Sequence, residues 1–385
     1  MKYNLIATAT FGLESIVAGE LKKLGYEDVK VENGRVEFSG TEEDIMKCNL
    51  WLRSADRVLI KINEFKAESF EELFQGTMKY KWSDLIPLNG KMHVTGKSIK
   101  SKLYSVPDCQ GIVKKAVVEA MKKSYKTDWF EENGPVFKIE VGILKDIVTL
   151  TVDTSGSGLH KRGYREQAGE APLKETLAAA MILLSKWESP RIFADPFCGS
   201  GTIAIEAAMI GKNIAPGLGR SFVCETWPNF PESLCKKARE DAKAEENNAD
   251  FRVLASDINA KLLVTARENA VKAGVENLVA FQKLDVAEFK SRKKYGCIIS
   301  NPPYGERMGE LREVEKLYKT MGQVFAELDS WSFFIITSHP EFQKIFGKRA
   351  TKNRKLYNGR ILCYFYEYFG PLPRRRDFEE LQGAE

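Results

Sequence analysis

The second half of the chain contains four short apolar runs that suit β-strands, and each is closed by an acidic or amide residue. The closing residues are Asp195, Asp257, Asp285 and Asn301. Helical patterns separate the runs, most clearly between Ala260 and Ala273. Strands that alternate with helices form an open parallel sheet, and ligands bind at the carboxyl edge of such sheets. The pattern therefore predicts an α/β fold with a Rossmann-like sheet whose carboxyl edge carries the four polar residues.

A glycine-rich loop follows the first run and precedes a segment, 203–210, that is rich in good helix formers. Glycines at such a turn let the backbone approach a ligand closely, and a helix N-terminus favours a carboxylate or phosphate. The stretch 199–204 also fits G-x-G-x-x-A, so a nicotinamide or flavin oxidoreductase is an alternative. The candidate cofactor-binding residues of the loop are Asp195, Pro196, Phe197, Cys198, Gly199, Ser200, Gly201 and Thr202.

The next two strand ends complete a candidate nucleotide site. A carboxylate at Asp257 can accept both hydroxyls of a ribose, and one at Asp285 can accept an adenine amine. The residues that follow them, Ile258 and Val286, belong to the same candidate cofactor site. Taken singly, each aspartate is more often a solvated turn residue. A nucleotide site is favoured because the two aspartates follow the glycine loop in order, each at the end of a predicted strand.

The fourth run ends in Asn-Pro-Pro-Tyr at 301–304. This combination suits a planar amine whose nitrogen attacks an electrophilic methyl group. The Asn301 oxygen can accept an N–H, while Pro302 and Pro303 present carbonyl oxygens without competing N–H donors. The ring of Tyr304 can stack on a flat substrate. These four residues are the catalytic candidates, Asn301 is also counted with the cofactor site, and a proline-rich turn after a buried strand is the alternative.

The motifs at 195–202, 256–259 and 301–305 resemble those of S-adenosylmethionine-dependent amino-methyltransferases. The segments 158–165 (GLHKRGYR) and 171–179 (APLKETLAA) resemble RNA guanine-N2 methyltransferases with an N-terminal THUMP domain, bacterial 23S ribosomal RNA enzymes especially. The resemblance covers nearly the whole chain. It implies a class I methyltransferase fold with a terminal antiparallel hairpin and S-adenosyl-L-methionine as cofactor. Some members carry a second methyltransferase domain, and only one catalytic domain is expected here.

The implied reaction is in-line methyl transfer to the exocyclic N2 of a guanine in 23S ribosomal RNA, on a base that is unpaired or flipped out. Transfer RNA is the alternative substrate. Another exocyclic amine, such as adenine N6 in RNA or DNA, would suit the same tetrapeptide. An oxidoreductase would leave 301–304 without a task, and an inactive RNA-binding assembly factor would not need all the motifs intact.

The chain divides near residue 165. A strand, helix, strand pattern at 3–38 suggests a ferredoxin-like α+β subdomain over residues 1–65. The resemblance places a THUMP domain over residues 66–165 and the catalytic domain over residues 166–385. The Gly/Ser run at 153–158 is predicted to be a hinge.

Two further features concern the catalytic half. Pro172 suits the first position of a helix over 173–187, and Asn358-Gly359 predicts a hairpin. The segment 211–250 lengthens the gap between the glycine loop and Asp257, and the sequence assigns it no role.

The net charge of +5 is modest, so nucleic-acid binding has to be argued from the distribution of charge. Residues 91–126 hold nine lysines and two acids, and residues 342–376 hold ten lysines or arginines and one acid. Such stretches fit phosphate contacts, although a solvated lysine face is the alternative. Together with a base-methylating motif they favour RNA as the partner.

Other function classes lack support in the sequence. The seven cysteines form no C-x-x-C pair and there are only three histidines, so neither a metal site nor a histidine-based triad is expected. There is no signal-peptide pattern and no apolar run of membrane-spanning length. A cytoplasmic protein without a membrane partner is therefore expected, and its oligomeric state cannot be inferred.

Overall fold

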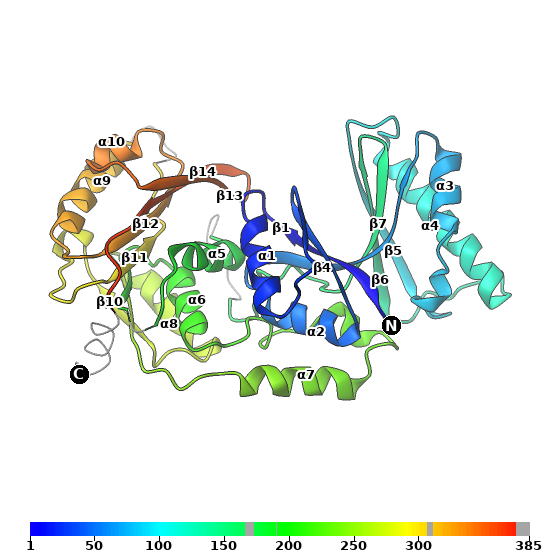
Figure 1. Ribbon diagram of the computed structural model, residues 1–385, viewed down its shortest axis with the longest axis horizontal. Coiled ribbons are helices and arrows are strands. Elements are labelled where there is room, and N and C mark those ends of the chain that lie inside the picture. The colour runs from blue at the N-terminus through cyan, green and yellow to red at the C-terminus, as the bar shows by residue number, and fades with distance from the viewer. Residues whose placement is uncertain (166–172, 190, 306–310, 375–385) are drawn as a thin grey trace. The chain divides into compact units, whose positions relative to one another are not determined.

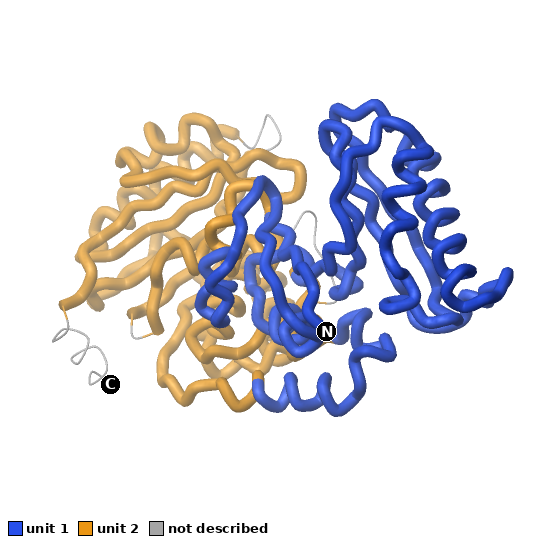
Figure 2. Tube along the Cα trace, turned by 45° about the vertical axis from the view of Figure 1, so that its right-hand side comes forward, with its two compact units in different colours: residues 1–9, 18–159, 221–241 blue, residues 10–17, 160–220, 242–385 orange. Residues whose placement is uncertain are grey.

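The computed structural model describes residues 1–165, 173–189, 191–305 and 311–374. The chain forms two compact units (Figure 2). Unit 1 comprises residues 1–9, 18–159 and 221–241, and unit 2 comprises residues 10–17, 160–220 and 242–385. Two segments therefore belong to the unit that is built mainly from the other half of the sequence.

Unit 1 holds a seven-stranded sheet in the order β2-β3-β1-β4-β7-β6-β5, of which β1 and β4 to β7 are labelled in Figure 1. All neighbouring strands are antiparallel except β5 and β6. The strands are β1 (Tyr3–Ala9), β2 (Lys30–Glu32), β3 (Arg35–Gly40), β4 (Ala55–Lys66), β5 (Lys91–Ile99), β6 (Val136–Leu144) and β7 (Ile147–Asp153). The helices are α1 (Glu14–Lys23, in unit 1 from Ala18), α2 (Glu42–Trp51), α3 (Phe70–Met78), α4 (Val106–Tyr125) and α7 (Glu232–Ala244, in unit 1 up to Asp241), with 3-10 turns at Trp82–Asp84 and Val223–Thr226.

The sequence at the start of α2 and α3 explains where these helices begin. Thr41 and Asp44 form a capping box at α2, and Ser69 and Glu72 form one at α3. In each, the side chains satisfy backbone N–H groups that lack partners in the first turn. The strand, helix, strand pattern predicted for 3–38 is confirmed by β1, α1 and β3.

The predicted hinge at 153–158 is wrong for its first residues. Thr154 and Ser155 are fully buried. The Thr154 hydroxyl donates to the Val58 carbonyl at 2.7 Å, and the Ser155 hydroxyl donates to the Asn49 side-chain oxygen at 2.6 Å. Short hydroxyl side chains readily bond to nearby backbone and polar groups. Here they anchor the segment after β7 instead of making it flexible.

The central part of the 211–250 segment contributes to the core of unit 1. The Trp227 ring stacks on Phe137 with 4.6 Å between ring centroids. The Trp227 indole N–H donates to the Val136 carbonyl at 3.0 Å. Residues 221–241 therefore complete the hydrophobic packing of β6, a role that depends on a partner some ninety positions away in sequence.

Unit 2 holds a second seven-stranded sheet in the order β10-β9-β8-β11-β12-β14-β13. Its strands are β8 (Phe193–Asp195), β9 (Val253–Asp257), β10 (Val279–Lys283), β11 (Cys297–Ser300), β12 (Ser332–Thr337), β13 (Lys352–Asn358) and β14 (Ile361–Tyr368). Its helices are the start of α1, α5 (Glu175–Ser185), α6 (Thr202–Gly211), the end of α7, α8 (Ala260–Lys272), α9 (Leu311–Ala326) and α10 (Phe342–Phe346), with a 3-10 turn at Val286–Glu288. The predicted helix over 173–187 corresponds to α5, and Pro172 lies outside the described residues.

The strand order of unit 2 reverses between β8 and β11, which is where a ligand site is expected in such a sheet. Strands β10, β9, β8, β11 and β12 are parallel, and β14 is antiparallel to β12 and β13. The chain runs from β8 outward to β9 and β10, then returns to form β11 on the other side of β8. Ligands bind at the carboxyl ends of the strands where the order reverses in this way. The predicted hairpin is confirmed, since Asn358 closes β13 and Gly359 has φ +62°.

The helix after β8 is buried on nearly all sides. Residues 202–209 of α6 are buried, including Glu206. A helix that is apolar almost all round lies within a core. The loop before α6 therefore leads directly into a helix that is packed in the core of unit 2. In the part of the chain that the structure describes, no helix combines the length and the apolar character that a membrane crossing needs.

Candidate active site

The loops after β8 and β11 are joined directly at the switch point. β8 ends at Asp195 and β11 ends at Ser300. The Ser300 hydroxyl donates to Oδ1 of Asp195 at 2.8 Å, and the Phe197 N–H donates to the same oxygen at 3.2 Å. The structure thus brings together the glycine loop and the Asn301 tetrapeptide, which lie about a hundred residues apart in sequence.

Asp195 is a buried carboxyl group with one unsatisfied oxygen. It is 1% exposed, and in the described part of the chain its Oδ2 has no hydrogen-bond partner. Burial raises the pKa of Asp195 to about 7, with a smaller contribution from Asp257, while the bonds from Ser300 and Phe197 act in the opposite direction. Buried polar atoms are nearly always paired. The free oxygen therefore fits a ligand that carries a donor or a positive charge.

The glycine loop takes conformations that only glycine adopts easily. Gly199 has φ +53° and Gly201, at the start of α6, has φ +87°. A Cβ at Gly201 would lie 3.1 Å from the Cβ of Ala266, whereas a Cβ at Gly199 would meet nothing within 4 Å. The Asn269 side chain donates to the Ser200 carbonyl at 3.0 Å. The loop is thus fixed by α8 on one side and has open space beside Gly199.

Asp257 is held as an acceptor beside this loop. The Gly199 N–H donates to its Oδ2 at 2.9 Å, and the Asn259 N–H donates to its Oδ1 at 2.8 Å. Each carboxylate oxygen has a second lone pair, so hydroxyl groups of a ligand can still be accepted. The neighbouring Ile258 is 65% exposed and offers an apolar surface next to the carboxylate. This arrangement suits a nucleoside, whose ribose is polar and whose base is flat.

Asp285 lies at the end of the neighbouring strand. β10 pairs with β9 in the register Lys283 to Asp257, so the two strand ends are adjacent. Asp285 is exposed and accepts the Ala287 N–H at 2.9 Å, and Val286 beside it is buried. The carboxylate caps the turn after β10 and retains capacity to accept a ligand amine.

The remaining loop residues have structural surroundings. Burial raises the pKa of the Cys198 thiol, which keeps it uncharged at neutral pH. Pro196 is buried and Phe197 is partly buried against the core of unit 2. The Thr202 hydroxyl accepts a hydrogen bond from Arg165.

In the tetrapeptide, the two polar side chains bond to each other. The Tyr304 hydroxyl donates to the side-chain oxygen of Asn301 at 2.6 Å. The Tyr304 ring packs partly buried against the core, and burial raises the pKa of its hydroxyl, which therefore stays a donor at neutral pH. Pro302 is buried and Pro303 is exposed. The bond orients the Asn301 oxygen and leaves its second lone pair for a substrate amine.

Sequence reasoning missed the residues that hold the glycine-loop helix. Arg162 donates through Nε and Nη2 to the two oxygens of Glu206 at 3.3 Å each, and the Tyr164 hydroxyl donates to Glu206 at 3.2 Å. Arg165 forms an ion pair with Glu175 at 3.3 Å. The 158–165 motif thus anchors α5 and α6. The available signal was Glu206 itself, a charged residue inside an apolar helix, because such residues are rarely buried without a partner.

The basic stretches are partly offset by acids outside them. Four lysines of 91–126 form ion pairs with such acids: Lys97 with Glu140 at 2.7 Å, Lys102 with Glu68, Lys114 with Glu132 at 2.9 Å, and Lys122 with Asp128 at 4.0 Å. In the second stretch, a hollow of about 430 Å³ is lined by Gln343, Lys344, Gly347, Lys348 and Arg349. Arg375 and Arg376, counted in that stretch, lie outside the described residues.

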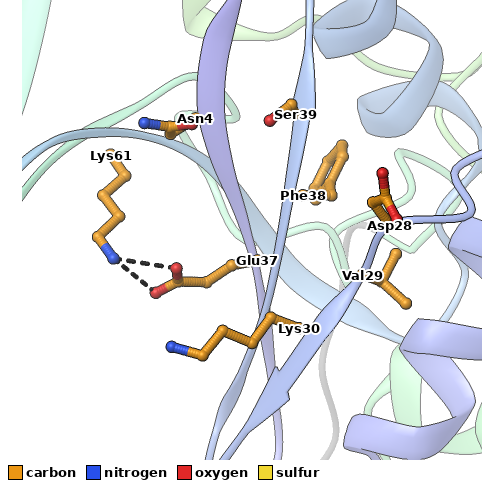
Figure 3. A pocket seen from close by; sticks show the side chains of 8 residues that line it. All are labelled: Asn4, Asp28, Val29, Lys30, Glu37, Phe38, Ser39 and Lys61. Carbon is orange, nitrogen blue, oxygen red and sulfur yellow. Dashed lines mark hydrogen bonds and ion pairs between the residues drawn. The ribbon is translucent and has the colours of Figure 1, made fainter.

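Another hollow, of about 450 Å³, lies in unit 1 (Figure 3). Its lining comes from β1, the segment before β2, β2 itself, β3 and β4: Asn4, Asp28, Val29, Lys30, Glu37, Phe38, Ser39 and Lys61. The Lys61 ammonium donates to both Glu37 oxygens at 2.9 Å, so the charges of these two side chains compensate each other. None of the predicted site residues lines this hollow. Within the described ranges, no cluster of His, Cys, Asp or Glu has the arrangement of a metal site.

Three family models match the chain. A model described as "RMKL-like, methyltransferase domain" matches residues 162–367, one described as "RlmL ferredoxin-like domain" matches residues 4–59, and one described as "THUMP domain" matches residues 67–153.

Individual proteins are similar to this chain over nearly its whole length. "Putative RNA methyltransferase YpsC" of Bacillus subtilis is 50% identical and covers 98% of this chain and 99% of its own. "Ribosomal RNA large subunit methyltransferase K/L" of Vibrio parahaemolyticus is 34% identical over 99% of this chain. The chain spans 55% of the length of that K/L protein. The solved structure of SMU.472, complexed with SAH, has a TM-score of 0.91 at 46% identity and covers 97% of this chain and 99% of its own.

These matches confirm the predicted fold class, a Rossmann-like methyltransferase sheet with a terminal antiparallel hairpin and N-terminal ferredoxin-like and THUMP regions. The oxidoreductase alternative, which rested on the glycine loop alone, is excluded by the methyltransferase match. The chain belongs to the RMKL-like methyltransferase family.

Proposed function

We propose that this protein transfers a methyl group from S-adenosyl-L-methionine to the exocyclic N2 of a guanine in RNA, with 23S ribosomal RNA as the substrate. The observation that carries the proposal is the bond between Ser300 and Asp195, which fixes an amine-accepting tetrapeptide next to a nucleoside-binding loop. The names of the related YpsC and K/L proteins support RNA as the methylated polymer. An RNA substrate of this kind places the activity in the cytoplasm.

The residues at the switch point fit the cofactor, and the related SMU.472 is complexed with its demethylated product. S-adenosyl-L-methionine supplies an electrophilic methyl group and carries a positively charged amino group. The free oxygen of Asp195 suits that amino group, and Asp257 suits the ribose hydroxyls. Ile258 and Val286 would flank the adenine, with Asp285 accepting its amine. Pro196 to Thr202 would supply the backbone of the site.

The tetrapeptide would position the acceptor amine. The N2 amine of guanine is a weak nucleophile because its lone pair is delocalised into the ring. Two acceptors, the Asn301 oxygen and the Pro302 carbonyl, would take its two N–H groups and turn the lone pair toward the methyl group. At most, positioning of reactants lowers an activation barrier by ~7–11 kcal/mol. We expect it to supply several kcal/mol here. The base would stack on the Tyr304 ring, and it would have to be unpaired or flipped out of a helix to reach this position.

A direct assay tests the function. The full-length protein is incubated with methyl-labelled S-adenosyl-L-methionine and either 23S ribosomal RNA or transfer RNA, and the modified nucleosides are identified by mass spectrometry. We expect N2-methylguanosine in the ribosomal RNA. N2-methylguanosine in transfer RNA alone would change the substrate, and N6-methyladenosine would change the acceptor.

Asp195→Asn should weaken cofactor binding and remove its pH dependence. Since the pKa of Asp195 is raised to about 7 in the free protein, a cationic ligand binds better as the pH rises through 7, and its affinity falls roughly tenfold for each pH unit below. The asparagine can still accept from Ser300 and Phe197. Losing a bond to a charged partner should weaken binding by about 1.5–3 kcal/mol. Calorimetry with S-adenosyl-L-methionine at pH 6–8 measures both effects.

The thermal stability of the free protein gives a check on Asp195 that needs no ligand. A carboxyl group whose pKa is raised by folding destabilises the protein as the pH increases from about 4 to 7. The wild type should therefore lose more stability over this range than Asp195→Asn. Identical pH profiles, together with equal cofactor affinity, would contradict the assigned role.

The domain division proposed from the sequence is 1–65, 66–165 and 166–385, with RNA captured by the second of these. Among the described residues, Tyr104 is the most exposed of the large hydrophobic residues, at 83%, and Lys100 and Lys102, which are close to it in sequence, are exposed too. Because Lys102 also pairs with Glu68, most of the binding energy at this place would come from the ring. An exposed aromatic side chain among lysines suits an unpaired base and its phosphates.

Tyr104→Ala should weaken binding of RNA by about 1–3 kcal/mol, the usual loss when one stacking side chain is truncated. Tyr104→Phe keeps the ring and should bind as the wild type does. Filter binding of a ribosomal RNA fragment at fixed salt measures the difference, and the salt concentration has to be kept constant because phosphate contacts depend on it. Equal affinity of the alanine variant would place RNA binding elsewhere.

A further inference from the structure

The carbonyl of Pro303 is held by a buried tyrosine that none of the sequence motifs contains. Tyr318 is on α9 and is fully buried. Its hydroxyl lies 2.6 Å from the Pro303 carbonyl oxygen and 2.8 Å from Oγ1 of Thr337, the last residue of β12. Oγ1 of Thr337 in turn accepts the N–H of His339 at 3.1 Å. The acceptor loop is therefore connected to the end of the neighbouring strand.

The chemistry of the groups fixes the direction of each hydrogen bond in this series from Pro303 to His339. A carbonyl oxygen carries no proton, so Tyr318 must donate its only proton to Pro303. Tyr318 can then only accept from Thr337, whose hydroxyl proton points toward it. One lone pair of Thr337 takes the His339 N–H. Each of the two hydroxyls thus has a defined partner as donor and a defined partner as acceptor.

The ring that carries the hydroxyl is fixed as well. Tyr318 packs edge-on against Phe342, at 4.9 Å between ring centroids, and against His339, at 5.6 Å. Burial raises the pKa of Tyr318 to about 12, so its hydroxyl remains a donor throughout the neutral range. A rigid ring with a protonated hydroxyl can hold the carbonyl at one place.

We propose that Tyr318, oriented by Thr337, is a positioning residue for methyl transfer that fixes the backbone of the acceptor loop at Pro303. The proposal rests on the proposed function of the tetrapeptide and deepens it. Tyr304 orients the side chain of Asn301, and Tyr318 orients the backbone two residues further on. Tyr318 takes one lone pair of the Pro303 carbonyl and fixes its direction, while the Asn301 oxygen and the Pro302 carbonyl are the acceptors assigned to the substrate amine.

Tyr318→Phe removes one hydroxyl and keeps the ring packing. The turnover number should fall on the order of 100-fold, the effect of a displacement of about 1 Å at a reacting group. The KM for S-adenosyl-L-methionine and the affinity for RNA should stay unchanged, because Tyr318 is buried behind the loop. Thr337→Val should lower turnover less, since Tyr318 keeps its proton for Pro303. Thr337→Ser retains the hydroxyl and should restore normal turnover.

Tyr368→Phe is the matched control. Tyr368 is also a buried tyrosine of unit 2, and its hydroxyl donates to a backbone carbonyl, that of Lys348, at 3.2 Å. This variant should lose thermal stability as Tyr318→Phe does and keep normal turnover. A Tyr318→Phe enzyme whose turnover matches that of Tyr368→Phe, or which changes only in KM, would overturn the proposal.

Hydrogen exchange separates this proposal from the proposed function. The amides of the peptide 301–305 should exchange faster in Tyr318→Phe than in the wild type or Tyr368→Phe, whether or not RNA is the substrate. If the wild type methylates no guanine in RNA but the exchange difference is present, the function is wrong and the positioning contact stands. If exchange is the same in all three proteins, the positioning role of Tyr318 is wrong.

Discussion

Asn301→Ala should nearly abolish methyl transfer while leaving the affinity for RNA unchanged. The variant removes the side-chain oxygen that would accept the guanine amine, and the amine then loses its alignment in the transition state. Removing one preorganised hydrogen-bonding group from an active site lowers turnover on the order of 100- to 1,000-fold. One base contact contributes little beside many phosphate contacts, so RNA binding should persist. Single-turnover methylation and separate filter binding measure the two quantities.

Tyr304→Phe is the companion variant. Its ring can still stack, but the hydroxyl that donates to the Asn301 oxygen at 2.6 Å is lost. Turnover should therefore fall by less than in Asn301→Ala. It should still be below that of the wild type, because stacking of the ring does not orient the Asn301 oxygen. Near-normal turnover in Asn301→Ala would mean that the tetrapeptide is only a turn and that the acceptor site lies elsewhere.

Glu206→Ala should have the largest effect on stability, a loss of about 3–5 kcal/mol of unfolding free energy. Glu206 is completely buried, and Arg162 beside it is 2% exposed. Truncating the carboxylate removes the charge that compensates the guanidinium and the acceptor of the Tyr164 hydroxyl. Because α6 starts at the glycine loop, cofactor binding should decline together with stability.

Denaturant unfolding measures the free energy of unfolding of each variant, and two further variants serve as comparisons. Glu206→Gln keeps an acceptor for Arg162 and Tyr164 and should lose less. Asp329→Ala breaks an ion pair with Lys294, at 2.9 Å, in which both side chains are 62% exposed. Water and salt screen the charges of an exposed pair, so this control should be nearly neutral. A Glu206→Ala protein as stable as the Asp329→Ala protein would show that the buried pair is dispensable.

The edge of the parallel sheet could be predicted from the sequence because its signals are local. Each strand of the site is a short apolar run closed by a polar residue, and the order of these runs is a property of the chain. Gly199 and Gly201 were found for the same reason, since their positive φ values are demanded by the turn that they form. Asn358-Gly359 predicted its hairpin from two residues alone.

Contacts between distant segments could not be predicted in this way. Residues 10–17 join unit 2, where Leu13 is in the core, although they lie near the start of the chain. Residues 221–241 join unit 1 through Trp227. A protein cut at residue 165 would therefore leave both units incomplete. The separate functions of the two units have to be tested by substitution instead.

Sequence alone predicts the class of sheet, the residues at its carboxyl edge and the methyltransferase chemistry that they suit. Which of these residues are held in place, and by which partners, follows only from the folded protein. Ser300 on Asp195, Tyr318 on Pro303 and Arg162 on Glu206 each join residues that only folding brings together. The physical reason is that periodicity and turn chemistry act over a few residues, whereas buried polar groups are satisfied by whichever partner the packing of the whole unit places beside them.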